Sequence, residues 1–165
     1  MTFTHKKALH DKIKIIVKEN ALQIIENPYA NFVIQIIIEC WPDYKEILSM
    51  YEGKYFYLSL EKYASNVVER CLEKDKEILH HYIEEIIEGE RISEVMKSNY
   101  GNYVIQKAIK LARGVHKQKL IYNAAKDINK LNDQKLIIKW KSILMSYSKE
   151  LDKDVIDSLK EQKLF

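Results

Sequence analysis

The chain has 165 residues, of which 47% are hydrophobic and 31% are charged, and its formal net charge is +3 at pH 7. This composition is typical of a folded globular chain and excludes an intrinsically disordered one. The presence of only four Gly and two Pro disfavours a turn-rich β architecture and favours helices, and the small net charge does not by itself predict nucleic-acid binding.

Helical periodicity runs through most of the chain. Apolar residues recur every three or four positions over residues 7–19, which predicts an amphipathic helix. Proline at positions 28 and 42 and glycine at positions 53 and 89 end later segments, and Asp43 is expected to cap one of them. The further predicted helices cover, in order, residues 21–26, 29–40, 44–52, 55–62, 64–73, 75–88, 91–97, 102–111, 115–126, 134–146 and 152–163.

Membrane and export signals are not apparent in the sequence. The longest strongly apolar stretch, residues 32–38, contains Gln35 and is too short to span a bilayer. The N-terminal residues lead into the first amphipathic segment and not into a signal-peptide core. Cys40 and Cys71 are expected to be buried packing residues that form no disulfide. These features predict a cytoplasmic protein in a reducing setting.

Three five-residue segments repeat one another. They read NFVIQ at residues 31–35, SNVVE at 65–69 and NYVIQ at 102–106, so that their first residues lie 34 and 37 positions apart. Each is preceded by a small residue and, one position earlier, by tyrosine. A period of this size is typical of a helical solenoid, in which each unit buries its apolar face against its neighbour. The sequence therefore predicts an all-α solenoid.

The repeat divides the chain into predicted units. Three full units cover residues 20–53, 54–89 and 90–126. Residues 1–19 are expected to be the C-terminal helix of a preceding or partial unit. Residues 127–165 remain amphipathic but lack the five-residue pattern, so they are expected to form a degenerate cap over the last apolar face.

Within each segment the polar and apolar positions separate by face. Positions one and five are an i, i+4 pair, so their side chains lie side by side on a helix. Positions three and four are apolar in every unit and are expected to be buried, which would leave the polar pairs on an exposed surface. These pairs are Asn31 with Gln35, Ser65 with Glu69, and Asn102 with Gln106.

The chemistry of the pairs suits base edges. A glutamine amide offers a donor beside an acceptor and matches uracil, whereas a carboxylate only accepts and matches the adjacent N–H donors of guanine. The second positions hold flat groups that could stack on bases: Phe32, Asn66 and Tyr103. Arg70 and Lys107 follow the fifth position and are candidate phosphate contacts, although a solvent role is equally compatible with the sequence.

Simpler interpretations exist for these residues. A single Asn/Gln pair is usually just a solvated helix face, and Phe32 or Tyr103 could be core aromatics; three pairs in register favour a recognition surface instead. The adjacent His80 and His81 diverge by about 100° on a helix and lack a second ligand pair, so neither a metal nor a cofactor is predicted. The segments hold no nucleophile and base pair, so we predict a binding protein and not an enzyme.

The segments that begin at Tyr29, Tyr63 and Tyr100 closely resemble repeats of the Pumilio (PUF) RNA-binding family. The resemblance is to the last three of the usual eight repeats, followed by a C-terminal cap. It implies a right-handed superhelix like those of armadillo and HEAT proteins, with one base read per repeat and the RNA antiparallel to the protein. The third unit would then read the first base, and the core would be 5′-UGU-3′.

By resemblance, the expected function is sequence-specific binding of single-stranded RNA in mRNA 3′ untranslated regions, with recruitment of decay or translation-repression factors. The alternatives are a nucleolar, nonspecific nucleic-acid-binding relative in ribosome biogenesis, and a peptide-binding solenoid. Alternation of Gln and Glu favours specific reading, because a nonspecific binder of a polyanion has no need of a carboxylate. Three bases set against an association cost of roughly 4–15 kcal/mol predict weak binding, on the order of micromolar, without missing repeats, a partner or self-association.

Overall fold

The computed structural model describes residues 3–161 and residue 163, and every regular element within them is a helix. The α-helices are α1 (Phe3–Glu19), α2 (Ala21–Glu26), α3 (Asn31–Cys40), α4 (Tyr44–Leu48), α5 (Tyr55–Leu60), α6 (Ala64–Lys74), α7 (Lys76–Glu88), α8 (Ile92–Lys97), α9 (Gly101–Leu111), α10 (Gly114–Lys126), α11 (Gln134–Ser146) and α12 (Lys153–Glu161). Short 3₁₀ helices occur at Ser49–Tyr51, Ile128–Leu131 and Ser148–Glu150.

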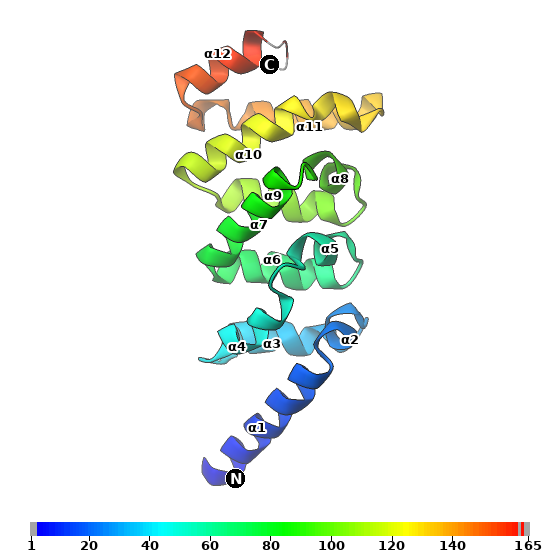
Figure 1. Ribbon diagram of the computed structural model, residues 1–165, viewed down its shortest axis with the longest axis vertical. Helices are drawn as coiled ribbons and strands as arrows, with labels where there is room; N and C mark the ends of the chain where they lie inside the picture. The colour runs from blue at the N-terminus through cyan, green and yellow to red at the C-terminus, as the bar shows by residue number, and fades with distance from the viewer. Residues whose placement is uncertain (1–2, 162, 164–165) are drawn as a thin grey trace.

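The helices stack in layers along one long axis (Figure 1). Each layer has three helices in chain order, α2–α3–α4, α5–α6–α7 and α8–α9–α10. The second helices pack directly on one another, with α6 between α3 and α9. The all-α solenoid predicted from the repeat period is confirmed. The unit boundaries predicted at residues 20–53, 54–89 and 90–126 stay a prediction, because the helices pack continuously across them.

The apolar middle of each five-residue segment forms the core between layers. Val67 and Val68 of α6 and Val104 and Ile105 of α9 are fully buried, as expected. The expectation is wrong for Val33, which is 40% exposed. Figure 1 shows the reason, since in the described part of the chain no second helix stacks on the N-terminal side of α3.

Helix α1 runs obliquely away from the stack and contacts α2 and α4 (Figure 1). Lys14 ties it to α4 through ion pairs with Asp43 and Glu46. Asp43 stands just before α4, but its side chain makes no capping hydrogen bond, so the predicted cap is wrong. Its carboxylate serves the ion pair instead. Asp75 does cap α7, because its carboxylate accepts a 2.9 Å hydrogen bond from the backbone N–H of Glu77.

The C-terminal helices cover the third layer. Trp140 of α11 is fully buried, and its Nε1 donates a 3.2 Å hydrogen bond to the backbone oxygen of Met96. Both cysteines are free, but only Cys71 is buried; Cys40 is exposed at the end of α3, contrary to expectation. None of the helices within the described residues combines the length and apolarity needed to cross a membrane.

Candidate nucleic-acid interface

All three five-residue segments occupy the first turns of second helices, and in two units a polar side chain accepts backbone hydrogen bonds in the turn that leads into the helix. In the first unit Oδ1 of Asn27 accepts 2.9 Å hydrogen bonds from the backbone N–H groups of Tyr29 and Ala30. In the third unit Oγ of Ser98 accepts from the N–H of Gly101 at 2.9 Å. These hydrogen bonds order the turn immediately before the two helices.

The first positions are buried, which corrects the expectation that they lie on an exposed surface. Asn31, Ser65 and Asn102 are 2%, 5% and 8% exposed. Nδ2 of Asn31 donates a 2.7 Å hydrogen bond to the backbone oxygen of Asn27, and Nδ2 of Asn102 donates to the oxygen of Ser98 at 2.8 Å. These amides add a side-chain hydrogen bond to carbonyl groups of the turn before the helix, which also accept from the backbone N–H groups of Asn31 and Asn102.

The same asparagines orient the glutamines at position five. Nε2 of Gln35 donates to Oδ1 of Asn31 at 2.9 Å, and Nε2 of Gln106 donates to Oδ1 of Asn102 at 3.1 Å. In the second unit Oγ of Ser65 donates to the backbone oxygen of Lys62 at 3.3 Å. Each glutamine is thereby held by a buried residue of its own helix and is itself only partly exposed.

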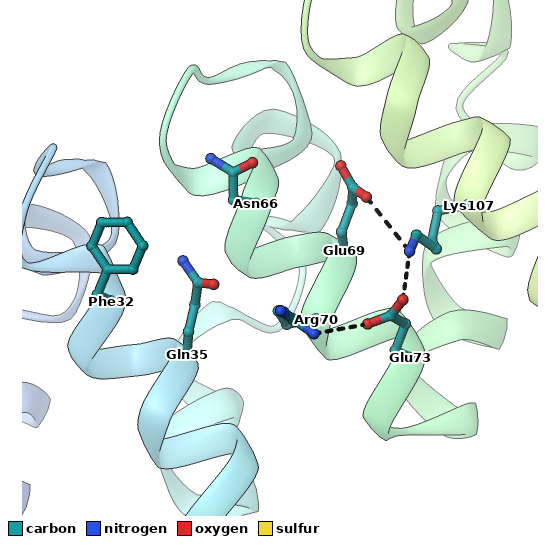
Figure 2. A pocket seen from close by; sticks show the side chains of 7 residues that line it. All are labelled: Phe32, Gln35, Asn66, Glu69, Arg70, Glu73 and Lys107. Carbon is teal, nitrogen blue, oxygen red and sulfur yellow. Dashed lines mark hydrogen bonds and ion pairs between the residues drawn. The ribbon is translucent and has the colours of Figure 1, made fainter.

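The second positions are exposed. Phe32 and Tyr103 are 58% and 59% exposed, so the alternative that they are core aromatics is wrong. Asn66 is exposed on α6 between them. Figure 2 shows Phe32 and Asn66 projecting from neighbouring helices on the same side as Gln35 and Glu69. Flat groups therefore alternate with polar ends along the stack.

Two hollows of about 450 Å³ each lie between successive second helices. The first is lined by Phe32, Gln35, Asn66, Glu69, Arg70, Glu73 and Lys107 (Figure 2). The second is lined by Asn66, Glu69, Tyr103, Gln106, Lys107, Lys110 and Tyr147. The structure thus brings together the exposed members of the predicted site, from residues more than 30 positions apart in the sequence.

Both cations proposed as phosphate contacts form ion pairs with acidic side chains of the protein. Nη1 of Arg70 lies 3.5 Å from Oε2 of Glu73 and 3.7 Å from Oε1 of Glu39 on α3. Nζ of Lys107 hydrogen-bonds Oε1 of Glu73 and lies 3.9 Å from Oε2 of Glu69 (Figure 2). In this state both cations neutralise carboxylates of the protein, so neither is an uncommitted positive charge.

The comparison with known families rests on the same units. The model of the Pumilio-family RNA-binding repeat matches residues 20–48, 54–87 and 91–123, each of which contains one of the five-residue segments. The chain belongs to the Pumilio family. It is 41% identical over 102 residues to Pumilio homolog 12 of Arabidopsis thaliana, a match that covers 59% of this chain and 17% of that protein. The match thus spans about a sixth of the length of this relative.

Solved structures of Pumilio-family domains superpose on most of the chain. The Puf3 RNA-binding domain, bound to recognition site A in the Cox17 RNA 3′ UTR, has a TM-score of 0.68 and 26% identity; the match covers 87% of this chain and 43% of Puf3. PUF-8 in complex with PBE-RNA has a TM-score of 0.69 over 98% of this chain and 46% of that one. At 16% identity the latter likeness shows the fold alone.

In this Pumilio-family chain the carboxylate at position five lies in a mixed environment. Burial, and secondarily the charge of Glu73, raise the pKa of Glu69 above its ordinary value, while Lys107 and Arg70 oppose the rise. The hydrogen bond from Lys107 lowers the pKa of Glu73. Glu73 is therefore held ionised by its ion pair, whereas the ionisation of Glu69 is set by a balance of burial and neighbouring charge.

Sequence reasoning missed several residues of this surface. Glu39 and Glu73 stand eight positions after the first residue of their segments, and Lys110 occupies the same position in the third unit. This shared position in the repeat was the sequence signal that could have assigned these three residues to the same surface. Lys139 of α11 donates a 3.3 Å hydrogen bond to Oδ1 of Asn102, and Tyr147 lines the second hollow. These two residues come from the cap, where no repeat pattern marks them.

Proposed function

We propose that this Pumilio-family chain binds single-stranded RNA along the exposed row of its second helices and reads a 5′-UGU-3′ core. The third unit would take the first base, the second unit the central base and the first unit the last. The observation that carries the proposal is the row itself, in which amide, carboxylate and amide ends project in register beside two hollows of about 450 Å³.

Within each unit the roles divide between buried and exposed residues. Gln106 and Gln35 present a donor beside an acceptor to uracil, and Asn102 and Asn31 hold them in place from inside. In the second unit Glu69 presents two acceptor oxygens to the N1–H and N2–H donors of guanine, and the small Ser65 places no acceptor against that carboxylate.

The flat groups at position two supply contact that does not depend on sequence. Phe32, Asn66 and Tyr103 are all exposed and separate the polar ends of successive units. Stacking of a base on an aromatic side chain contributes about 1–3 kcal/mol. This term adds affinity for any single strand, so the discrimination between bases has to come from position five.

Titration of short labelled RNAs tests the proposal. UGU should bind more tightly than UUU or UAU by about 1–3 kcal/mol, roughly the value of one well-matched pair of contacts to a base edge. The measurement is fluorescence anisotropy at two salt concentrations, with a scrambled RNA of the same length as control. Equal affinity for all RNAs would indicate nonspecific nucleic-acid binding, as in ribosome assembly. If none of the RNAs binds, a peptide-binding solenoid would be the remaining alternative.

Tight binding is proposed to need more surface than three units supply. Val33 and Ile36 leave the N-terminal side of α3 apolar and exposed, at 40% and 56%. Additional repeats, a partner protein or self-association at this face would extend the reading row or add avidity. Sedimentation at several protein concentrations, with and without RNA, checks self-association; a monomer with nanomolar affinity would contradict this part of the proposal.

At the cellular level we propose a post-transcriptional regulator in the cytoplasm that occupies mRNA 3′ untranslated regions and recruits decay or repression factors. The support is family membership together with the Puf3 structure, which holds a 3′ UTR recognition sequence. Crosslinking followed by sequencing of bound RNA tests it. Enrichment of UGU in 3′ untranslated regions is expected, whereas recovery of ribosomal precursor RNA from nucleoli would support the alternative.

A further inference from the structure

A chain of alternating charges crosses the reading surface from α3 to α9. Glu39 of α3 faces Arg70 of α6, Arg70 faces Glu73 one turn later, and Glu73 bonds Lys107 of α9. The cations directly follow the second and third five-residue segments, and the acids lie eight positions after the first residue of the first and second segments. The layers are therefore linked through side chains, and Arg70, Glu73 and Lys107 also line the first hollow.

Lys107 differs from Arg70 in what it approaches. Its Nζ bonds Glu73 and also lies 3.9 Å from Oε2 of Glu69, the reading residue of the unit before its own (Figure 2). The ion pairs of Arg70 are with Glu39 and Glu73, and the reading residue of the preceding unit is the neutral Gln35. Of these two cations, Lys107 thus lies in ion-pair range of the reading residue of the unit before its own, which is the charged Glu69, whereas Arg70 follows a unit whose reading residue is neutral.

Glu69 also lacks the support that the glutamines receive within their own helices. An asparagine one turn earlier accepts a hydrogen bond from each glutamine, but Ser65 donates to a backbone oxygen of the preceding turn instead. The ion pair to Glu69 comes from α9, through Lys107. The reading residue of the second unit is consequently supported by a side chain of the third unit.

We propose that Lys107 is a specificity-determining residue for the base read by the unit before its own, because its ammonium positions the Glu69 carboxylate and keeps it ionised for guanine. The inference rests on the proposed UGU reading and deepens it. It makes the preference at the central base a joint property of two repeats.

The ionised state matters because guanine offers two adjacent donors. An ionised carboxylate accepts from both, whereas a protonated one turns an O–H donor toward an N–H donor. The charged groups that face Glu69 are Arg70 and Glu73 from its own helix and Lys107 from α9; Gln35 on α3 is neutral, and Glu39 on α3 is engaged by Arg70. Burial and Glu73 disfavour the ionised form, and among the groups that favour it Lys107 acts most strongly.

The test compares Lys107→Met with wild type and with Lys110→Met. Lys110 lies one turn later on the same helix and lines the second hollow, but contacts neither Glu69 nor Glu73 through a recorded ion pair. Affinities for UGU and UUU are measured between pH 5 and pH 8. In wild type the preference for G should decline as pH falls, and the midpoint of this decline should lie above the ordinary range of a glutamate.

Lys107→Met should move that midpoint to higher pH. At pH values below both midpoints it should reduce the preference for G over U about tenfold for each pKa unit by which the midpoint moves, since the ionised fraction there changes tenfold per unit. Lys107→Arg should restore it. Lys110→Met should weaken UGU and UUU alike and leave the midpoint in place. An unchanged preference and midpoint in Lys107→Met would overturn the inference.

A second measurement does not depend on RNA. The Glu69 side-chain carboxyl is followed by ¹³C NMR during acid titration of the free protein, with thermal unfolding to show that each variant is folded. Its midpoint should rise in Lys107→Met; the same midpoint as wild type would overturn the role of Lys107 even if RNA binding changed. Absence of any preference for UGU in wild type would instead defeat the proposed function itself, together with the inference that rests on it.

Discussion

Nε2 of Gln35 donates a 2.9 Å hydrogen bond to Oδ1 of Asn31, one turn earlier on α3. The same contact recurs between Gln106 and Asn102 on α9. A glutamate in place of either glutamine would turn a carboxylate oxygen toward the asparagine carbonyl, so that two acceptors would face each other. The pairing of Asn with Gln and of Ser with Glu therefore follows from hydrogen bonding inside the protein as well as from the base proposed for each unit.

The first prediction exchanges the central pair. Ser65→Asn combined with Glu69→Gln should reproduce the flanking units and shift the central base from G to U, so that UUU binds more tightly than UGU by about 1–3 kcal/mol. Ser65→Asn alone should weaken both RNAs, since the new carbonyl oxygen would oppose the Glu69 carboxylate. Anisotropy titrations of wild type and both variants measure this. A double variant that still prefers G would show that the reading positions are assigned wrongly.

The second prediction concerns the buried asparagines. Asn102→Ala removes the side-chain donor to the backbone oxygens of Ser98 and Asn99 and leaves Gln106 only the backbone oxygen of residue 102 as acceptor. The unfolding free energy should fall by about 1–3 kcal/mol, because at least two buried hydrogen bonds of about 0.5–1.5 kcal/mol each are lost. Discrimination of U at the first base should weaken as well.

Chemical denaturation measures the loss of stability in Asn102→Ala. RNA titration about 20 °C below the melting temperature of the variant, where it is folded, measures the loss of discrimination at the first base. Asn99→Ala is the matched control, because Asn99 is exposed in the same turn and contributes only its backbone oxygen to these contacts. If the stability of Asn102→Ala is unchanged, water must replace the lost amide as hydrogen-bond donor to these backbone oxygens.

The third prediction isolates stacking. Tyr103→Ala should weaken binding of UGU, UUU and scrambled RNA alike, each by about 1–3 kcal/mol. Protein stability should change little, because the ring is 59% exposed. Tyr57→Ala is the control: Tyr57 is equally exposed, at 57%, but lies on α5 outside the reading row. Equal losses in the two variants would argue against a base stacked on Tyr103.

The fourth prediction concerns salt. Arg70 and Lys107 are paired with glutamates, so the exposed Lys110 is the better candidate for a phosphate contact. Lys110→Ala should lower the slope of log K against log salt by about 0.7, the value for one contact to a single strand, without changing the preference among bases. Lys119→Ala, which removes an exposed lysine from α10, should leave the slope unchanged.

Much of the fold was predictable because it depends on local pattern. Helices were expected at nearly all the places where they occur, and the period of the five-residue segments predicted the stacking of α3, α6 and α9. The departures have local causes. Asp43 does not cap α4 because Lys14 of α1 draws its carboxylate away, and Val33 is exposed because no second helix of the described residues covers that side of α3.

The candidate site was predictable only in its exposed part. Gln35, Glu69 and Gln106 lie on one open surface as the i, i+4 spacing implied, but the burial of Asn31 and Asn102 was not foreseen. On an isolated helix these amides would face water. In the structure the turn before each helix presents a carbonyl group to them, and spacing within the helix contains no information about that turn.

The sequence by itself determined the helices, the repeat period, the valines at their centres and the polar residue offered at position five of each unit, because all of these follow from periodicity and side-chain chemistry within about ten residues. Only the tertiary structure decided which charges meet. Lys107 reaches Glu69 and Glu73 across more than 30 positions of sequence, since α6 and α9 pack side by side and bring the second half of α9 beside the middle and end of α6. This proximity opposes the rise that burial causes in the pKa of Glu69, and it depends on how the layers stack.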